Sequence, residues 1–268
     1  MKRHRVMALA WAVALVAALA ATLVSGGVQA SDCEFEKKID LTLDLSGSEQ
    51  LTISATAGDL EVNGYADRGD ARIRGKVCAS EEQWLDDSRV VTASGRDASI
   101  AVETPAMEDG WTFFSRRYLY VDLEIDVPTA VALDIRDSSG DVAVIGTGPV
   151  NIRDSSGDIE LENVDGSAVL KDSSGDIKLR HIAGDVTVRQ DSSGDIYGRD
   201  IQGSVLVEHD SSGDIRFEEV LGDYVVERDS SGDIVAETVG GAFRVLSDGS
   251  GDVSYTGVSG EVKVPDEG

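Results

Sequence analysis

The sequence DSSGDV at residues 137–142 begins a series of near-identical phrases that decides the fold. The phrase recurs as DSSGDI at 154–159, 172–177, 191–196, 210–215 and 229–234, and as DGSGDV at 248–253. The glycines of these phrases stand at positions 140, 157, 175, 194, 213, 232 and 251, so the interval is 17, then 18, and 19 from there on. A fixed period of about 20 residues is typical of a solenoid, in which one short unit stacks on the next.

Apolar residues within one period fall at the second, fourth, seventh, eleventh and thirteenth positions after the glycine. The spacing of two within each short run is strand periodicity, and a second glycine separates the two runs. Each period therefore predicts strand, turn, strand, turn, and parallel crossovers are normally right-handed. We expect an all-β fold, a right-handed parallel β-helix or solenoid with about 19 residues per coil. After Gly213 the apolar positions are Ile215, Phe217, Val220, Tyr224 and Val226.

The part of the chain before the regular repeats, residues 31–128, predicts a less regular β region. The sequences LTI at 51–53 and GDLEV at 58–62 resemble one early, degenerate coil. Residues 121–127 alternate as a strand that Pro128 ends, and residues 79–89 predict a short helix or a loop. No linker separates this region from the solenoid repeats of residues 129–268, so we expect one continuous domain.

The first 30 residues have the pattern of a secretory signal peptide. A basic start is followed by an apolar stretch at 6–24 and by small residues up to Ala30, after which cleavage is expected. The alternatives are an uncleaved membrane anchor, because an apolar stretch of this length can just span a bilayer, and a lipid on Cys33. Asp32 disfavours the lipid, since small residues are expected at that position. After cleavage no transmembrane span is expected.

The two cysteines, Cys33 and Cys78, both remain after that cleavage. An even count in an exported chain suggests a disulfide, because export places the thiols in an oxidising compartment. Two buried free thiols are the alternative. A bridge would join the mature N-terminus to the body of the protein.

The net charge is −26, from 24 Lys and Arg against 50 Asp and Glu. Such an acidic chain lacks the basic footprint that phosphate binding needs, so we expect no nucleic-acid partner. It also disfavours direct adhesion to an anionic lipid surface. No catalytic motif of a hydrolase, phosphate loop or zinc protease occurs, and His181 and His209 occupy different positions of their coils. We therefore expect no enzyme activity and no resident cofactor.

Stacked phrases place their aspartates in two columns, with neighbours about 4.8 Å apart. Adjacent carboxylates would repel by roughly 1 kcal/mol even in water, so turn N–H groups or nearby basic residues must offset the repulsion. The basic candidates for pairing with the first column are Arg136, Arg153, Lys171, His209 and Arg228. The first column contains Asp137, Asp154, Asp172, Asp191, Asp210, Asp229 and Asp248, and the second contains Asp141, Asp158, Asp176, Asp195, Asp214, Asp233 and Asp252.

The second column supplies the candidate metal ligands, and calcium is the candidate ion. The Asp-x-Ser-x-Asp spacing resembles the start of a calcium loop, but such loops need Gly at position 6. Val142 or a β-branched Ile occupies that position, which disfavours a built-in cage and leaves only weak, shared cation binding between coils. Self-capped turns without any cation are the alternative.

The sequences LEIDVP at 123–128, LDI at 133–135 and SSGDV at 138–142 resemble the bacterial exported family DUF4097, whose members are called "putative adhesin". The resemblance spans roughly residues 40–264 and implies an exported β-helical protein, with no catalytic residues to transfer. We therefore expect a non-enzymatic protein of the periplasm, cell surface or medium, whose acidic scaffold serves interaction or adhesion with an envelope partner. A weak divalent-cation-binding module is the alternative, and a polysaccharide-active enzyme is a distant one.

Overall fold

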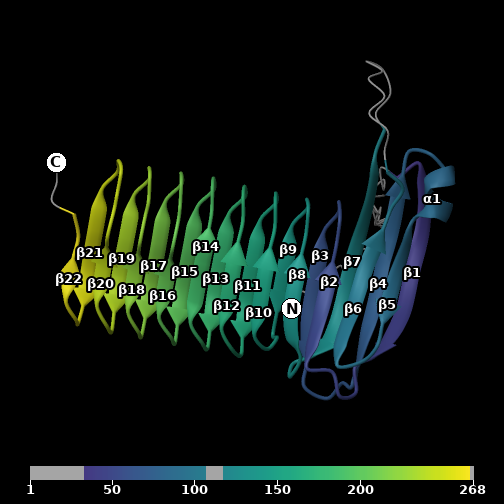
Figure 1. The fold of residues 1–268 in the computed structure, drawn as a ribbon, viewed down its shortest axis with the longest axis horizontal. Helices are drawn as coiled ribbons and strands as arrows, with labels where there is room; N and C mark the ends of the chain where they lie inside the picture. The colour runs from purple at the N-terminus through teal and green to yellow at the C-terminus, as the bar shows by residue number, and fades with distance from the viewer. Residues whose placement is uncertain (1–32, 107–116, 266–268) are drawn as a thin grey trace, which may run out of the picture. The chain divides into compact units, whose positions relative to one another are not determined.

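The computed structural model describes residues 33–106 and 117–265, which form two long β-sheets wound into one stack of coils (Figure 1). The signal peptide expected over residues 1–30 lies outside the described residues. None of the helices within the described ranges has the length and apolar character needed to cross a membrane.

Sheet A forms one wall of the stack and has 11 strands. Its outward positions alternate with buried ones, as in Ile159–Val164, because successive side chains of a strand point to opposite faces. In spatial order the strands are β1 (Phe35–Asp44), β4 (Asp70–Ala79), β7 (Leu119–Pro128), β3 (Leu60–Tyr65), β9 (Val142–Ile145), β11 (Ile159–Val164), β13 (Ile177–Ile182), β15 (Ile196–Ile201), β17 (Ile215–Val220), β19 (Ile234–Val239) and β21 (Val253–Val258).

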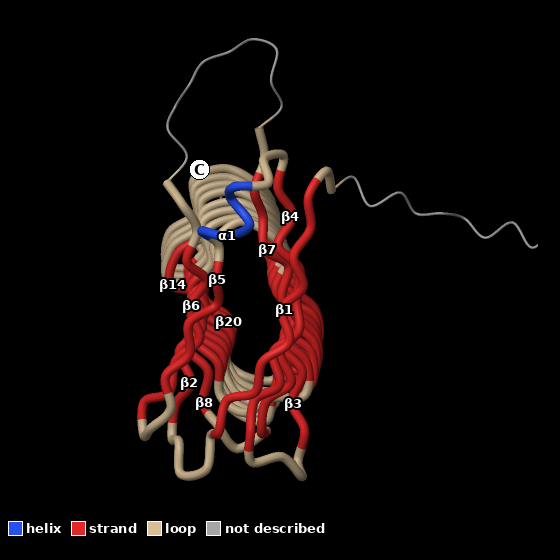
Figure 2. Tube along the Cα trace, turned by 90° about the vertical axis from the view of Figure 1, so that its right-hand side faces the viewer, coloured by secondary structure: helices blue, strands red, loops and turns tan. Residues whose placement is uncertain are grey.

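Sheet B forms the facing wall and also has 11 strands. Figure 2 shows the two walls with turns joining them at both edges. A short helix, α1 (Gln83–Asp87), lies near β1 and β4. In spatial order the strands of sheet B are β22 (Val262–Lys263), β20 (Phe243–Val245), β18 (Tyr224–Val226), β16 (Val205–Val207), β14 (Val186–Gln190), β12 (Ala168–Lys171), β10 (Val150–Arg153), β8 (Ala132–Arg136), β2 (Gln50–Ser54), β6 (Asp97–Glu103) and β5 (Arg89–Ala93).

The regular coils stack in parallel and in register. Each coil places one strand in each sheet, and the isoleucine after each DSSGD phrase pairs with the isoleucine of the next coil. All five apolar positions predicted for the coil after Gly213 are buried. The all-β parallel solenoid predicted from the period of the repeat is thus confirmed. The buried ladder consists of Ile159, Ile177, Ile196, Ile215 and Ile234.

The N-terminal region enters the same stack out of chain order. Strands β2 and β3 form the early coil predicted from residues 51–62, and β3 lies between β7 and β9. Strands β4 and β1 then continue sheet A in antiparallel fashion, while β5 does so in sheet B. The strand predicted at 121–127 is part of β7, and the short helix predicted within 79–89 is α1.

A disulfide joins Cys33 to Cys78, as the sequence predicted, with the two Cα atoms 5.3 Å apart. Cys78 lies in β4 and is fully buried, while Cys33 lies just before β1. The bridge therefore ties the start of the described chain to the antiparallel part of sheet A. Among the described residues no cysteine remains free.

Packing in the C-terminal coils depends on alternating large and small residues. A Cβ on Gly198 would come within 2.2 Å of the Phe217 ring, so the phenylalanine occupies the volume that the glycine leaves. The rings of Phe217, Tyr224 and Phe243 follow one another, with centroids 5.2 and 5.1 Å apart. Tilted contacts at this spacing are favourable for aromatic pairs, so these coils are held by shape as well as by apolar area.

Candidate functional site

The DSSGD turns lie above one another at one edge of the stack, where they connect sheet B to sheet A. Their glycines all have positive φ, for example +128° at Gly157 and +132° at Gly175. A Cβ on Gly157 would lie 2.0 Å from the carbonyl oxygen of Gly140 in the preceding coil. Only glycine fits both the backbone conformation and this close approach, which explains why this glycine is present in all seven phrases.

The serines of the turn connect neighbouring coils through their hydroxyl groups. The hydroxyl of the second serine in a phrase donates to the carbonyl of the first serine in the preceding phrase. Ser156 donates in this way to Ser138 at 3.2 Å, and Ser212 donates to Ser192 at 3.1 Å. The result is a band of small polar residues along the turn edge, which we call the serine band (residues 138–140, 155–157, 173–175, 192–194, 211–213, 230–232 and 249–251).

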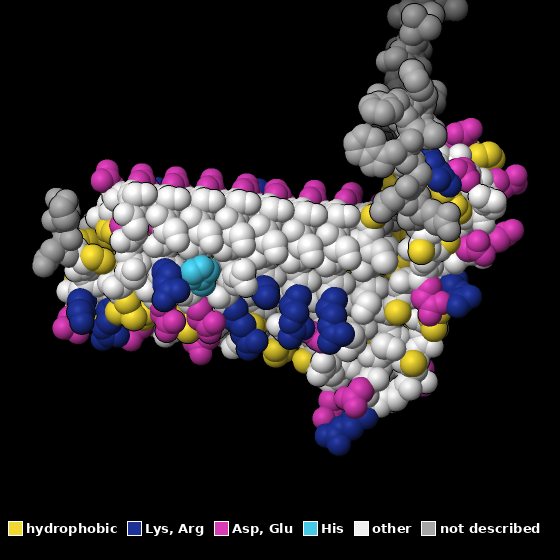
Figure 3. Space-filling view, turned by 45° about the horizontal axis from the view of Figure 1, so that its top comes forward, with side chains coloured by type: hydrophobic (Ala, Val, Ile, Leu, Met, Phe, Trp, Pro, Cys, Tyr) yellow, Lys and Arg dark blue, Asp and Glu magenta, His cyan; other side chains and the backbone are white. Residues whose placement is uncertain are grey.

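The second aspartate of each phrase lies at the surface and forms a column along the serine band. We call it the outer Asp column; two of its members, Asp158 and Asp176, have side chains that are 49% and 41% exposed. Figure 3 shows a row of acidic side chains along one border of the stack. The column consists of Asp59, Asp141, Asp158, Asp176, Asp195, Asp214, Asp233 and Asp252.

Each outer carboxylate links its coil to the next one. The Oδ1 atom accepts a hydrogen bond from the backbone N–H of the next aspartate, at 2.9 Å from Asp214 to Asp195 and 2.9 Å from Asp233 to Asp214. Hydrogen bonding to the ionised form favours that form. At Asp176, the N–H of Asp195 is the main cause of a lowered pKa, and Lys178 adds to it. The outer Asp column is therefore a ladder of carboxyl groups that are hydrogen-bonded from coil to coil.

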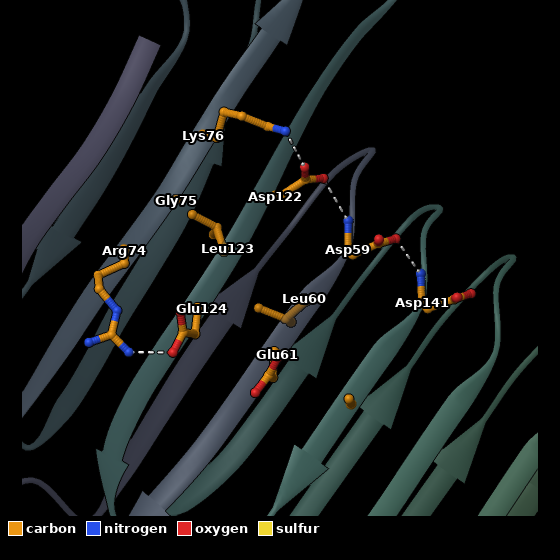
Figure 4. Close-up of a pocket in the computed structure, with 11 residues that line it drawn as sticks. Asp59, Leu60, Glu61, Arg74, Gly75, Lys76, Asp122, Leu123, Glu124 and Asp141 are labelled. Atoms are coloured by element: carbon orange, nitrogen blue, oxygen red, sulfur yellow. Dashed lines mark hydrogen bonds and ion pairs between the residues drawn. The ribbon is translucent and has the colours of Figure 1, made fainter. Parts of the chain in front are cut away.

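The outer Asp column extends further toward the N-terminal end than the repeat predicted. Asp59 accepts the N–H of Asp141 at 3.2 Å, and Asp122 accepts the N–H of Asp59 at 3.2 Å (Figure 4). Lys76 then pairs with Asp122 at 3.5 Å and ends the series with a positive charge. The sequence carries a signal for Asp59, in GDL at 58–60, but none for Asp122, which no glycine precedes.

A hollow of about 480 Å³ lies beside this end of the column, on the outer face of sheet A (Figure 4). Its floor is open because Gly75 has no side chain; a Cβ there would lie 2.4 Å from the backbone oxygen of Asp122. Its two cations are already paired, Lys76 with Asp122 and Arg74 with Glu124 and Asp126. Both cations of the hollow are therefore engaged, and its lining also includes Leu60, Leu123 and Ala143.

The first aspartate points into the stack in the six phrases from Asp137 to Asp229, and these six residues form the inner Asp column. Its members from Asp137 to Asp229 are at most 7% exposed, and Asp172, Asp191 and Asp210 are fully buried. The N–H of the following serine donates at 2.7 Å to Asp154 and at 2.7 Å to Asp191. Both carboxyl oxygens of Asp172 have no hydrogen-bond partner among the described residues.

Burial of these carboxyl groups favours their neutral form. Together with the charge on neighbouring aspartates, it raises the pKa of Asp137 to about 7 and that of Asp172 to about 6. The pKa values of the buried pair Asp210 and Asp229 are raised for the same main reason. The inner Asp column is thus a series of buried carboxyl groups whose pKa values are raised above the ordinary value.

The basic residues that precede the inner Asp column do not pair with it, which corrects the pairing expected from the sequence. The strand alternation that turns Asp137 inward turns Arg136 outward. Arg136 and Arg153 instead share Asp134, at 3.0 and 2.9 Å. We call this outward set the basic column: Arg136, Arg153, Lys171, His209 and Arg228.

The two histidines lie apart from one another, as their different positions in the coil predicted. His181 faces Asp200 at 3.7 Å on the surface of sheet A, and its backbone has a φ of +56°. His209 belongs to the basic column. Within the described part of the chain, no three His, Cys, Asp or Glu side chains are grouped so that they could hold a metal ion.

Comparison with known proteins places this architecture in a family. A family model described as Toastrack DUF4097 matches residues 23–197, which is more than half of the 268 residues. No curated protein matches the chain.

Solved structures that resemble the chain share little of its sequence. A "putative adhesin" of Bacteroides fragilis is 16% identical, with a TM-score of 0.42 over 85% of this chain and 97% of that chain. A "putative lipid binding protein" of Parabacteroides distasonis is 14% identical, with a TM-score of 0.37 over 86% and 97%. A "putative cell adhesion protein" of Clostridium sporogenes is 12% identical, with a TM-score of 0.31 over 86% and 99%.

Proposed function

The chain belongs to the Toastrack DUF4097 family, and we propose that it is an exported, non-enzymatic envelope protein whose rigid stack presents a binding surface to another envelope component. The observation that carries this proposal is the turn edge. The same serine band and the same outer carboxylate recur on every regular coil, in register, so charge is spread along an extended surface rather than gathered in a pocket.

Three features support an interaction scaffold over a catalyst. The stack is held by parallel ladders through the regular coils of both sheets, so the turn edge is a stiff support. In the hollow beside the N-terminal end of the outer Asp column, both cations, Arg74 and Lys76, are already paired with carboxylates. The disulfide between Cys33 and Cys78 suits an oxidising compartment outside the cytoplasm.

Export and binding can be tested separately. Mass spectrometry of the chain, expressed from its full sequence in a bacterial host, should show loss of residues 1–30 and an intact bridge between Cys33 and Cys78. Retention of residues 1–30 on a membrane fraction would favour an anchor instead. A full-length reduced chain in the cytoplasm would contradict export.

Binding is tested by co-sedimentation of the purified protein with isolated cell envelopes at a concentration at which it is monomeric. We expect the double variant Asp195→Asn and Asp214→Asn to lose at least tenfold in affinity, because it removes two charges while each Asn still accepts the inter-coil hydrogen bond. The matched control is Asp185→Asn with Asp223→Asn, which changes equivalent acceptors at the opposite turn. Equal binding by all three proteins, or by none, would contradict the proposal.

A further inference from the structure

The serine band separates two columns of opposite charge. The outer Asp column lies on its sheet A side and the basic column on its sheet B side, because the band is the turn that joins the two sheets. Figure 3 shows the acidic row at one border of the stack and a band of uncharged surface below it. A row of basic side chains that includes one histidine lies below this band. The chain, although strongly acidic overall, thus has one edge with a lateral charge gradient.

Several of these charges are unpaired within the described residues. Lys171 and Arg228 are exposed and form no ion pair with residues 33–106 or 117–265, and neither do Asp214 and Asp233 on the acidic side. Lys178 already neutralises Asp158 and Asp176 from the face of sheet A, at 3.2 Å in both cases.

We propose that a second copy of this chain docks along the serine band, with the outer Asp column of each copy facing the basic column of the other. The complementarity follows from symmetry. A two-fold axis parallel to the stack reverses the acidic and basic sides, so opposite charges meet, and the two stacks run parallel. A two-fold axis along the band's short direction would place acid against acid.

The spacing of the columns favours this partner over a flexible polymer. The outer Asp column repeats once per coil, and the basic column occupies five of the seven turns, with Gln190 and Ser247 in the other two. Because strands are about 4.8 Å apart in both copies, the two columns match in one register. A partner also needs both signs of charge, and the edge of a second copy carries both at the required separation. Because the band consists of serine and glycine, no bulky side chain prevents close approach of the two edges.

The net charge of −26 sets the ionic strength at which the copies can meet. At 0.01 M salt the screening length is about 30 Å, so the two acidic bodies repel as wholes. At 0.15 M it is about 8 Å, which screens that repulsion but leaves contacts across the band, and at 1 M it is about 3 Å. Association should therefore be strongest at intermediate salt.

Sedimentation velocity of the exported protein tests the docking at these three salt concentrations. We expect a concentration-dependent dimer at 0.15 M salt that is weaker at both extremes. Lys171→Glu with Arg228→Glu should weaken it at least tenfold, because like charges would then face each other across the band. Asp214→Asn with Asp233→Asn should weaken it to a similar extent.

Matched controls make the same kinds of charge change away from the serine band. They are Lys38→Glu with Arg72→Glu on β1 and β4, and Asp185→Asn with Asp223→Asn at the opposite turn. Both controls should dimerise like the original protein, since neither alters the two columns that meet.

Cysteine cross-linking tests the arrangement. In a parallel, in-register dimer, Ser155→Cys should form a disulfide with itself, as should Ser230→Cys, while a mixture of the two should give no mixed product. A monomer at every salt concentration, a dimer equally strong in all variants, or mixed cross-links alone would overturn the proposal. Binding of dextran sulfate to the basic column of a protein that stays monomeric would also overturn it, in favour of an anionic polymer. Because envelope binding is measured on the monomer, either proposal can fail without the other.

Discussion

The inner and outer Asp columns contain the same residue, four positions apart in the same turn, yet they have opposite environments. Asp191 is fully buried, and burial raises its pKa. Asp195 is exposed and accepts the N–H of Asp214 at 2.9 Å. The alternation of the flanking strands makes the difference: the inner aspartate continues the inward positions of sheet B, and the outer one precedes the first inward residue of sheet A. The position of an aspartate in the pleat, rather than its residue type, thus decides whether burial raises the pKa of its carboxyl group.

The two columns also solve the problem of repeated like charge in different ways. A buried, unpaired carboxylate is costly, so burial raises the pKa values of the inner groups and favours their protonated form. The outer groups lie in contact with water and with the N–H of the next coil. One turn sequence therefore produces a buried carboxyl ladder inside the stack and a hydrated carboxyl ladder on its surface.

The largest effect is expected when a carboxylate is placed inside the stack without a turn around it. Ile196→Asp would bury such a group in the middle of the isoleucine ladder and should destabilise the protein by about 4 kcal/mol. Because coils interact mainly with their neighbours, unfolding should begin there. Denaturant unfolding, with Ile196→Val as a control that should cost only about 1 kcal/mol, measures the effect. A melting temperature like that of the original protein would contradict the assigned register.

The pH dependence of stability should reveal the inner Asp column. The folded protein holds protons that the unfolded chain releases near pH 4, so stability is complete below that pH and falls as pH rises through about 6 to 7. Each unit of pKa difference is worth about 1.4 kcal/mol. We expect the free energy of unfolding to fall by at least about 2 kcal/mol between pH 5 and pH 9.

The control for this pH dependence is Asp137→Asn with Asp172→Asn, which resembles the protonated column. This variant should lose stability less steeply with rising pH than the original protein. Identical pH profiles would show that the inner Asp column does not bind the protons. Below pH 4 the sign reverses, because Asp176 has a lowered pKa and its stabilisation is lost as it becomes protonated.

Removal of one acceptor from the outer Asp column should have a smaller effect. Asp195→Ala leaves the N–H of Asp214 without its partner and should cost about 1 kcal/mol, since that group remains close to water. Asp195→Asn keeps an acceptor oxygen and should be close to neutral. Thermal unfolding of both variants makes the test, and an equal loss of stability in the two would show that charge, not the hydrogen bond, matters at this position.

Calcium should have the smallest effect on stability. Each outer carboxylate already uses one oxygen for an N–H of the next coil, so successive coils offer fewer than the six to eight oxygens that calcium prefers. A millimolar concentration should raise the melting temperature only slightly, and magnesium should do less. The same titration on Asp195→Asn with Asp214→Asn is the control. A large, saturable shift that this variant loses would make the outer Asp column a true cation site.

The repeat in the sequence was sufficient to predict the stack, because period and alternation are local properties. The inward positions of the coil after Gly213, the early coil and the partners of the disulfide all follow from it or from the cysteine count. The insertion of β3 between β7 and β9 could not be predicted, since it depends on a contact between distant segments. No local sequence pattern indicates that β3 will pair with β7 on one side and with β9 on the other.

The candidate site was predicted only in part. Both Asp columns were found, but treating them as equivalent turn residues hid the burial of the first. The signal was present in Ile135, Arg136 and Asp137, whose alternation already turns the arginine outward and the aspartate inward. The expected pairing between the basic residues and the first column was wrong for this reason, and the lateral charge gradient of the turn edge was missed with it.

Carbon-13 NMR of the aspartate carboxyl groups across pH tests most directly the claim that one turn produces two charge states. Aspartate-selective labelling and assignment through the Asn variants would give a titration curve for each column. The structure predicts that Asp137 and Asp172 titrate near pH 7 and 6, whereas Asp176 of the outer Asp column has a pKa below its usual value. A single set of titrations below pH 5 for both columns, in the folded protein, would contradict it.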